Sequence, residues 1–324
     1  MKKLLLLVFT FATALLIGGL MTPKTSAIDP APPPVQIYIT PVEVNLSLDP
    51  GEVYDGTFEV RNSGAETYDF RVSASQFYVK DLTYETTYDD GLAFNQIIEW
   101  ITFDQTEFRG LEPNEKQEVA YHIKVPKDAP GGGQYAVLFA TVSSKVSDGG
   151  YDILTDSRVG VKVYAQIAGK TRLEGKLESV NQARFYQKGP INSTVRVKNT
   201  GNVDFNSTHE YVIKSLGGRE LYRDSISKRI MPGTVREIGL KWWDKEKDTD
   251  ETPMFGIFRV QNKVYFIGKV QYDEENIVVV APIWLVIILA IVLLLIIGLI
   301  ILLIMFLVKR NRHKKILESQ KSEK

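Results

Sequence analysis

VRNSG, at residues 60–64, returns later in the chain as VKNTG, at residues 197–201. Each copy closes a stretch in which apolar and polar residues alternate, TFEVR at 57–61 and STVRVK at 193–198. A period of two is typical of a β-strand with one buried face. The Asn and Gly that follow tolerate the left-handed backbone that tight turns need. We therefore expect a strand and a turn of the same kind in each half of the chain.

Further alternating segments lie on both sides of these two phrases. The clearest runs over residues 41–48 and ends at the turn signal DPG, residues 49–51. Other expected strands are residues 68–72, 97–103, 117–125, 135–142 and 159–167. Short strands separated by turn residues indicate antiparallel sandwiches. The chain is therefore predicted to be mostly β, with two Ig-like antiparallel β-sandwich domains followed by one C-terminal transmembrane helix.

The predicted membrane span is residues 277–308, where nearly every residue is apolar and none is charged. About 20 such residues are enough to cross the hydrocarbon layer. A buried helix of a soluble domain is a poor alternative, because it would need a polar face. Three acidic residues precede the span, at 273–275, and five basic residues follow it, at 309–315. The excess of basic residues predicts that the tail, residues 309–324, is cytoplasmic.

The N-terminus has the pattern of an export signal. Lys2 and Lys3 precede an apolar run at residues 4–20, and Thr25-Ser26-Ala27 is a small-residue cleavage site. We predict a signal peptide at residues 1–27, with a retained N-terminal anchor as the alternative. The four prolines within residues 28–36 predict an extended linker. The predicted location is the cell membrane, with a single pass and the N-terminal side extracellular.

Two sandwiches of unlike charge are expected between linker and span. Their predicted limits are 37–156 and 157–276, with the boundary near the polar stretch 143–157. The chain has 39 basic and 39 acidic residues overall, but 28–156 has a net charge of −14 and 157–277 one of +6. Such charges can steer partners, or can be solvated surface that keeps each half soluble. The absence of cysteine excludes disulfide staples and thiol catalysis.

The search for reactive residues returns no strong site. His122 lies in an alternating strand and is expected to be structural. Asp89 and Asp90 lack the alternating oxygen ligands of a calcium loop and are more simply solvated. Residues 131–133, three glycines, lack the Lys-Ser/Thr that follows a phosphate loop and are read as a turn. We expect no catalytic residue, no cofactor and no metal, although a spatial pair of carboxylates cannot be recognised from sequence alone.

Trp242 and Trp243 provide the best candidate for a binding residue. In a strand, Trp242 joins Ile238 and Leu240 on one face, and Trp243 joins Lys241 on the other. One tryptophan of the pair is expected to be core. Trp243 is the candidate binding residue, as an exposed aromatic platform for a glycan or a protein, and covering a domain interface is the alternative.

The chain resembles the WxL-interacting protein family of Gram-positive cell surfaces, as a divergent member. The resemblance rests on LDPG at 48–51 leading into VRNSG, on LEP at 111–113 and GGQY at 132–135, and on NTGN at 199–202 with MPG at 231–233. It implies a first domain associated with peptidoglycan binding and a second associated with proteins, including WxL-bearing partners and host ligands. Residues 81–94 and the Trp242-Trp243 region depart from the family's pattern.

These observations predict a non-enzymatic, membrane-anchored binding scaffold or adhesin of the cell surface. The expected partners are peptidoglycan, cell-surface proteins such as WxL-domain proteins, and the membrane through the C-terminal helix, but not nucleic acid. Two alternatives remain open. One is a wall-active carbohydrate enzyme, and the other is a purely structural component of the envelope.

Overall fold

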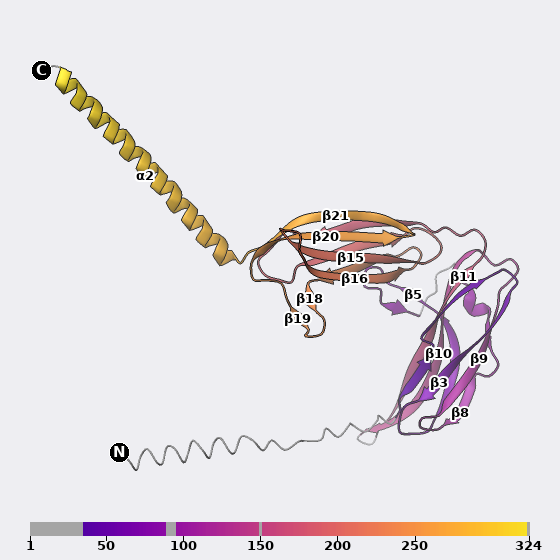
Figure 1. Ribbon diagram of the computed structural model, residues 1–324. Coiled ribbons are helices and arrows are strands. Elements are labelled where there is room, and N and C mark those ends of the chain that lie inside the picture. The colour runs from indigo at the N-terminus through magenta and orange to yellow at the C-terminus, as the bar shows by residue number, and fades with distance from the viewer. Residues whose placement is uncertain (1–34, 89–94, 149–150, 323–324) are drawn as a thin grey trace, which may run out of the picture.

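A computed structural model of the protein describes residues 35–88, 95–148 and 151–322 (Figure 1). The fold prediction is confirmed: two Ig-like antiparallel β-sandwiches are followed by one long C-terminal helix. The predicted signal peptide, most of the predicted linker, and Asp89 and Asp90 lie outside the described residues.

The first sandwich consists of a four-stranded and a five-stranded sheet. The first sheet has the order β1 (Ile37–Thr40), β3 (Val53–Asn62), β9 (Lys116–Lys124) and β7 (Ile101–Phe103), and a short 3-10 helix, η1 (Ile97–Glu99), precedes β7. The second has the order β2 (Glu43–Leu48), β11 (Tyr151–Ile167), β10 (Gly132–Asp148), β4 (Tyr68–Gln76) and β8 (Glu107–Leu111). All neighbouring strands are antiparallel except β2 and β11. A small hairpin, β5 (Tyr78–Val79) and β6 (Thr86–Thr87), follows β4.

Strand β10 is buried on both faces. Ala136, Leu138 and Ala140 pack into the core between the two sheets. Tyr135, Val137 and Phe139, on the other face, pack in a separate cluster with Phe77 and Val79. Residues 135–140 are therefore nearly all apolar, because both faces of the strand are buried there. A strand with one solvated face would alternate apolar and polar residues.

The second sandwich also has two sheets, one of three strands and one of five. The smaller has the order β12 (Gly175–Gln182), β14 (Asn192–Asn199) and β17 (Val235–Lys241). The larger has the order β13 (Phe185–Tyr186), β21 (Lys269–Val280), β20 (Gly256–Phe266), β15 (Phe205–Ser215) and β16 (Glu220–Ile230). Only β13 and β21 are parallel neighbours. A hairpin, β18 (Trp243–Asp244) and β19 (Thr249–Asp250), projects from the end nearest the helix (Figure 1).

Strand pairing corrects the predicted domain boundary. The polar stretch 143–157 lies within the long hairpin of β10 and β11, where Ser143 pairs with Asp156 and Gly132 with Ile167. The first sandwich therefore extends to Ile167, and the boundary lies between Ile167 and Gly175. The sequence missed this because a polar segment at the tip of a long hairpin resembles a linker in composition.

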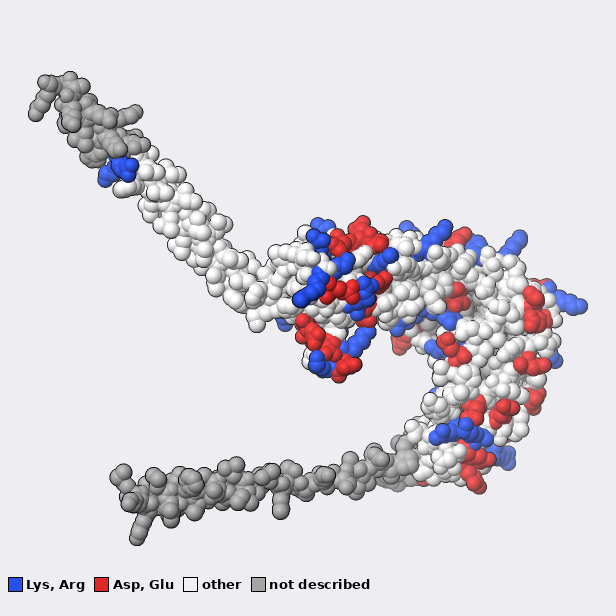
Figure 2. Space-filling model, viewed as in Figure 1, with Lys and Arg blue, Asp and Glu red and all other residues white. Residues whose placement is uncertain are grey.

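The start of the helix is a second correction. Helix α2 (Ile283–Ser322) begins after β21, and residues 277–280 of the predicted span belong to that strand. A run of valines is compatible with a buried strand and with a membrane helix, so composition alone does not show where the strand ends and the helix begins. The helical segment from Ile283 to Arg310 is long and apolar enough to cross a membrane. Figure 2 shows it without charged side chains up to its far end.

The repeated phrase forms a hydrogen-bonded corner in each sandwich. In the first, the buried Asn62 amide donates to the carbonyl oxygens of Glu66 at 2.8 Å and Leu111 at 3.0 Å. Its Oδ1 accepts from the Gly64 N–H at 2.9 Å. One side chain thus satisfies three backbone groups where the strand turns away from the sheet.

Asn199 repeats the arrangement in the second sandwich. Its amide donates to the carbonyl oxygens of Val203 at 2.8 Å and Ile230 at 2.9 Å, and its Oδ1 accepts from the Gly201 N–H at 2.8 Å. Asn199 is as completely buried as its counterpart. We call these two arrangements the asparagine corners.

Candidate functional site

The two sandwiches meet in a buried contact that we call the junction. Its first-sandwich side consists of residues 45, 77–84, 131–135, 162 and 164, and its second-sandwich side of residues 202–204 and 229–236. The sandwiches lie at a marked angle to each other across this contact (Figure 1). The junction is the candidate functional site, because it decides how the two domains are presented together.

Glycines allow the two backbones to approach at one edge of the junction. The Asn202 amide donates to the carbonyl oxygens of Gly131 at 3.0 Å and Lys170 at 2.9 Å. The Gly133 N–H donates to the Asn202 carbonyl oxygen at 2.7 Å. A Cβ on Gly131 would lie 2.6 Å from the Lys170 backbone nitrogen. Lys170 belongs to the connection between the sandwiches, whereas a Cβ on Gly132 would lie 2.9 Å from Asn202 Nδ2 of the second sandwich. The glycines that were read as a simple turn, two of which belong to β10, therefore allow close packing against both.

Tyr135 carries the deepest polar contact of the junction. Its ring is fully buried, and its hydroxyl donates to Asp204 Oδ1 at 3.0 Å while accepting from the Asp204 N–H at 3.1 Å. Burial raises the pKa of this hydroxyl, and the neighbouring carboxylate raises it further. The tyrosine therefore stays a neutral donor, which suits a structural bond between domains.

Arg229 binds the edge of the first sandwich from strand β16. Its guanidinium lies 3.7 Å from the centre of the Tyr164 ring. It also contacts Asp204 at 3.2 Å within its own sandwich, and Asn45 at 2.8 Å across the junction. A half-buried arginine that stacks on a ring and binds on both sides favours one relative position of the domains.

The hairpin of β5 and β6 crosses to the second sandwich, and we call residues 78–87 the strap. The Leu82 N–H donates to the Val235 carbonyl oxygen at 2.8 Å, and the Val235 N–H donates to Asp81 Oδ1 at the same distance. Leu82 forms a parallel bridge with Arg236 of β17. The strap therefore pairs with the edge of the smaller sheet of the second sandwich. Residues 81–88 belong to the segment that departs from the family's pattern.

Tyr84 and Met231 fill the centre of the contact. The Tyr84 hydroxyl lies 2.8 Å from the Thr234 hydroxyl and accepts from the Met231 N–H at 2.6 Å. The Met231 side chain is buried in the same cluster as Phe77 and Tyr135, so a second-sandwich residue completes a cluster of the first. Burial raises the pKa of Tyr84. Apolar packing and directional bonds thus converge on one place.

A small cavity of about 90 Å³ remains between the domains. Its lining includes Lys162, Arg229 and Arg236, together with the rings of Phe77 and Tyr84. The Arg236 guanidinium lies 3.9 Å from the centre of the Tyr84 ring, and burial lowers its pKa. The cavity is smaller than the pockets that hold small-molecule ligands.

A larger, open hollow of about 340 Å³ lies on the first sandwich, lined partly by Asp69, Arg71, Glu107 and Arg109. Nearby, Arg71 pairs with Asp156 at 2.9 Å, and the pKa of Asp156 is lowered, chiefly by the Ser143 hydroxyl that bonds to it. A general acid would need a raised pKa. The hollow is an open surface lined largely by charged and polar side chains. That the protein is not an enzyme stays a prediction.

Trp242 and Trp243 occupy different environments. Trp242 is core, as one of the pair was expected to be, and it packs edge-on against Phe258 and stacks near Tyr222. Trp243 is half-buried at the start of β18, with Lys241 Nζ 3.4 Å from its ring centre. Its indole N–H donates to Asp248 at 2.9 Å. Lys241 covers one face of the ring, so a partner could stack only on the other face. The binding role of Trp243 remains a prediction.

His122 bridges two carboxylates on the surface of the first sandwich. Nδ1 lies 2.5 Å from Asp55 and Nε2 lies 2.8 Å from Asp104. The hydrogen bonds that the ring donates to the carboxylates of Asp55 and, second, Asp104 raise the pKa of His122. Within the described part of the chain, no group of three or more His, Cys, Asp and Glu side chains is placed to hold a metal ion.

Sequence reasoning missed most of the junction. Its residues are far apart in the chain, and each looks ordinary alone. One signal was present: the repeated phrase is followed by Ala65 in the first copy and by Asn202 in the second. Asn202, which contacts the first sandwich, therefore occupies a position at which the two copies of the repeat differ.

No family model matches the chain, and no curated protein matches it. The resemblance to WxL-interacting proteins therefore stays a prediction. The similar solved structures include the class 5 fimbriae chaperone CfaA, at 10% identity and a TM-score of 0.38, covering 76% of this chain and 100% of that chain. They also include the E. coli chaperone DraB, at 12% identity and a TM-score of 0.34, covering 75% and 98%. A complex of the Salmonella enterica SafA pilin with the SafB chaperone gives 13% identity and a TM-score of 0.33, covering 75% and 96%. At TM-scores below 0.5, the likeness assigns neither a family nor a partner to this chain.

Proposed function

We propose that the chain is a single-pass protein of a bacterial cell membrane that displays two rigidly joined sandwiches as a non-enzymatic binding scaffold. The observation that carries the proposal is the junction. A flexible tether would not need the part-buried Tyr135–Asp204 bond, or a methionine of the second sandwich buried in the apolar cluster on the outer face of β10. Fixed geometry is useful when a partner touches both domains, because the binding surface is then organised before the partner arrives.

The support for the anchor comes from the helix and its flanks. Ile283–Arg310 is long and apolar enough to span a bilayer. The acidic residues before it and the basic residues after it favour an orientation with the sandwiches outside the cell. The N-terminal signal pattern favours the same orientation.

Peptidoglycan and surface proteins are the proposed partners. The resemblance to WxL-interacting proteins is the reason for choosing wall polymer and WxL-domain proteins first. Free edges supply a physical route to protein partners: β16 ends the larger sheet of the second sandwich, and β8 ends the larger sheet of the first. An edge strand can accept a partner strand through backbone hydrogen bonds.

The test is retention of partners by the full chain in lipid nanodiscs. Purified wall fragments and a WxL-domain protein are each passed over immobilised nanodiscs, at moderate salt to suppress charge-driven adsorption. Empty nanodiscs and nanodiscs holding the Met231→Ala variant are the controls. The proposal predicts retention that weakens when the junction is loosened. A folded, inserted chain that retains neither partner would contradict it and favour a purely structural role.

A further inference from the structure

The outer face of the larger sheet of the second sandwich changes character along its length. Far from the helix, Lys263 of β20 is opposite Asp273 of β21, and their charged groups lie 3.4 Å apart. Nearer the helix, Ile257 is opposite Val279. Directly opposed residues, and residues two apart on one strand, share a face. The same face therefore runs from ion pairs to apolar side chains as it approaches the helix.

Most apolar residues at this end of the face are exposed, and Val279 is half-buried. Phe255 is 61% exposed, Ile257 47% and Ile277 59%. The intervening Phe258, Val278 and Val280 point inward and are buried. Phe185 of β13 lies opposite Val279 and is also exposed, which widens the patch across three chain segments. We call Phe185, Phe255, Ile257, Ile277 and Val279 the apolar end.

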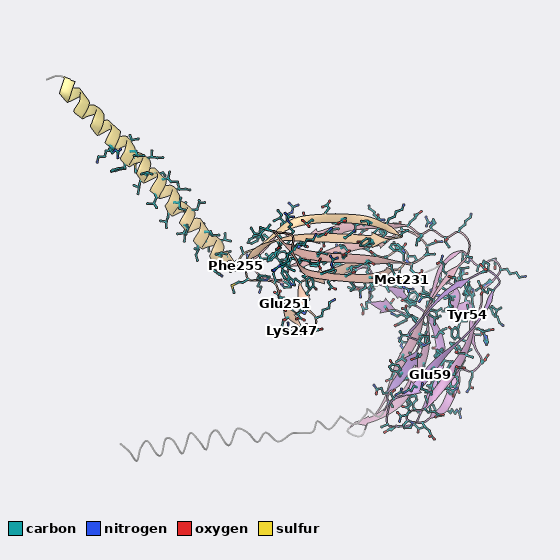
Figure 3. All side chains as sticks on the ribbon, viewed as in Figure 1. Tyr54, Glu59, Met231, Lys247, Glu251 and Phe255 are labelled. Atoms are coloured by element: carbon teal, nitrogen blue, oxygen red, sulfur yellow. The ribbon has the colours of Figure 1, made fainter. Side chains whose placement is uncertain are left out.

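The apolar end is coupled to the helix by a very short connection. Only Ala281 and Pro282 separate β21 from α2, and the Ala281 N–H donates to the Tyr186 carbonyl oxygen at 2.9 Å. Phe255 lies beside this connection in Figure 3. At about 3.3 Å per strand residue, Ile277 lies within roughly 20 Å of the first helical residue along the chain. The interfacial layer on each side of the hydrocarbon is only about 5–8 Å deep. An upright sandwich would therefore leave much of the apolar end in water.

The helix is longer than an upright span requires. The uncharged part of the helix, residues 283–308, measures about 39 Å at 1.5 Å per residue. The hydrocarbon layer is about 30 Å thick. Excess apolar length is commonly accommodated by tilting. A tilted helix with a two-residue connection lowers one side of the attached sandwich toward the bilayer.

We propose that the apolar end rests in the interfacial layer of the membrane, so that the second sandwich leans on the bilayer beside its own helix. The occupant of this surface is lipid. The proposal rests on the membrane anchor of the proposed function. The hairpin of β18 and β19 projects from the same end but carries charged side chains, including Lys247 and Glu251, so it remains hydrated and the contact is one-sided (Figure 2, Figure 3). The lean fixes the direction in which the rigidly attached first sandwich points.

Because the chain has no cysteine, single cysteines can report on this contact cleanly. Ile257→Cys carries an environment-sensitive fluorophore in full-length protein in nanodiscs. Lys263→Cys, on the same face of the same strand, is the matched control, and Leu295→Cys reports insertion of the helix. The labels at 257 and 263 are measured with a quencher on the upper lipid chain, the label at 295 with a quencher near the end of the lipid chain, and all three with a water-soluble quencher. The proposal predicts that the label at 257 loses most of its fluorescence to the lipid quencher and is protected from the aqueous one, whereas the label at 263 behaves oppositely.

The outcomes separate the lean from the anchor. If lipid quenches the label at 295 but not the label at 257, the lean is wrong and the anchor stands. If the label at 295 is not quenched, the anchor fails and the lean fails with it. Protection at 257 from the aqueous quencher without lipid quenching would mean that protein covers the patch, which also overturns the proposal. Replacing Phe255 and Ile277 together by Ser is expected to return the label at 257 to water.

Discussion

The two asparagine corners have the same chemistry and different surroundings. Asn62 and Asn199 each satisfy three backbone groups in the same pattern. The turn that packs beneath each corner is also equivalent, with Asn114 at a φ of 67° in the first and Gly233 at 74° in the second. The neighbouring side chains differ: Glu112 is exposed, whereas Met231 is buried in the junction.

This comparison separates what builds a sandwich from what joins two of them. The shared residues close the strand turn and would be needed in any copy of the domain. The unlike residues, Met231 for Glu112 and Asn202 for Ala65, are the ones that contact the other sandwich. The junction is therefore encoded in departures from the repeat. The following predictions test that division.

The largest effect is expected from removing either corner. Asn62→Ala and Asn199→Ala each leave one N–H and two carbonyl oxygens without their side-chain partner, at a cost of about 3 kcal/mol or more in the free energy of unfolding. Hydrogen exchange resolved by sandwich should show faster opening in the sandwich that carries the substitution. Asn181→Ala, at an exposed site, is the control. Equal exchange in variant and parent would show that the corners are not what closes the turns.

Met231→Ala tests the unlike position. Truncation of a buried methionine typically costs about 2–5 kcal/mol, and we expect the low end because Met231 lies in a small cluster outside the main cores. Glu112→Ala, at the equivalent exposed position, should change stability by no more than about 0.5 kcal/mol. In calorimetry, Met231→Ala should separate the unfolding of the two sandwiches. Similar effects from both substitutions would remove the distinction between the two corners.

Trp243→Ala probes a part of the second sandwich outside the repeat. Loss of the contact with Lys241 at a partly exposed site should cost about 0.5–1 kcal/mol. The melting temperature should therefore change little, while retention of the partner falls if the predicted binding role is right. If the folded variant retains the partner as well as the parent does, Trp243 has only a structural role in the hairpin.

Acidification should change the stability of the two sandwiches in opposite directions. His122 has a raised pKa, so its contribution is complete below the unfolded value of about 6.5 and is lost as pH rises through the folded pKa. His209 lies in β15 of the second sandwich and is fully buried, and burial lowers its pKa. Its contribution is therefore present above about 6.5 and is lost as pH falls through the folded pKa. Between pH 8 and pH 5, the free energy of opening, obtained from hydrogen exchange after correction for the pH dependence of the intrinsic exchange rate, should rise in the first sandwich and fall in the second. His122→Gln and His209→Gln should each abolish the trend in its own sandwich, and a common trend in both would contradict the assignment.

Much of the fold could be predicted because strands and apolar helices have local signatures. The alternation around Phe58 and Val60, the repeated corner and the apolar segment within 283–310 are all visible in short windows. The domain boundary and the helix start were misplaced, because a hairpin tip resembles a linker and a valine-rich strand resembles a span.

The junction could not be predicted in the same way. Tyr84 meets Thr234 and Tyr135 meets Asp204 across 150 and 69 residues of sequence. Such pairs are fixed only when both sandwiches have folded and docked. Local patterns do not contain that information, so most of the strap was noted only as part of a segment, residues 81–94, that departs from the pattern of the resembled family.

The most direct test of the rigid junction is a distance measurement between the sandwiches. Thr57→Cys and Ser225→Cys, both at exposed positions, place one spin label on each sandwich of the full chain in nanodiscs. Pulsed dipolar spectroscopy should give one narrow distance distribution, which broadens when Met231→Ala is added. A broad distribution in the otherwise unaltered chain would contradict the account, because the two sandwiches would then be flexibly linked.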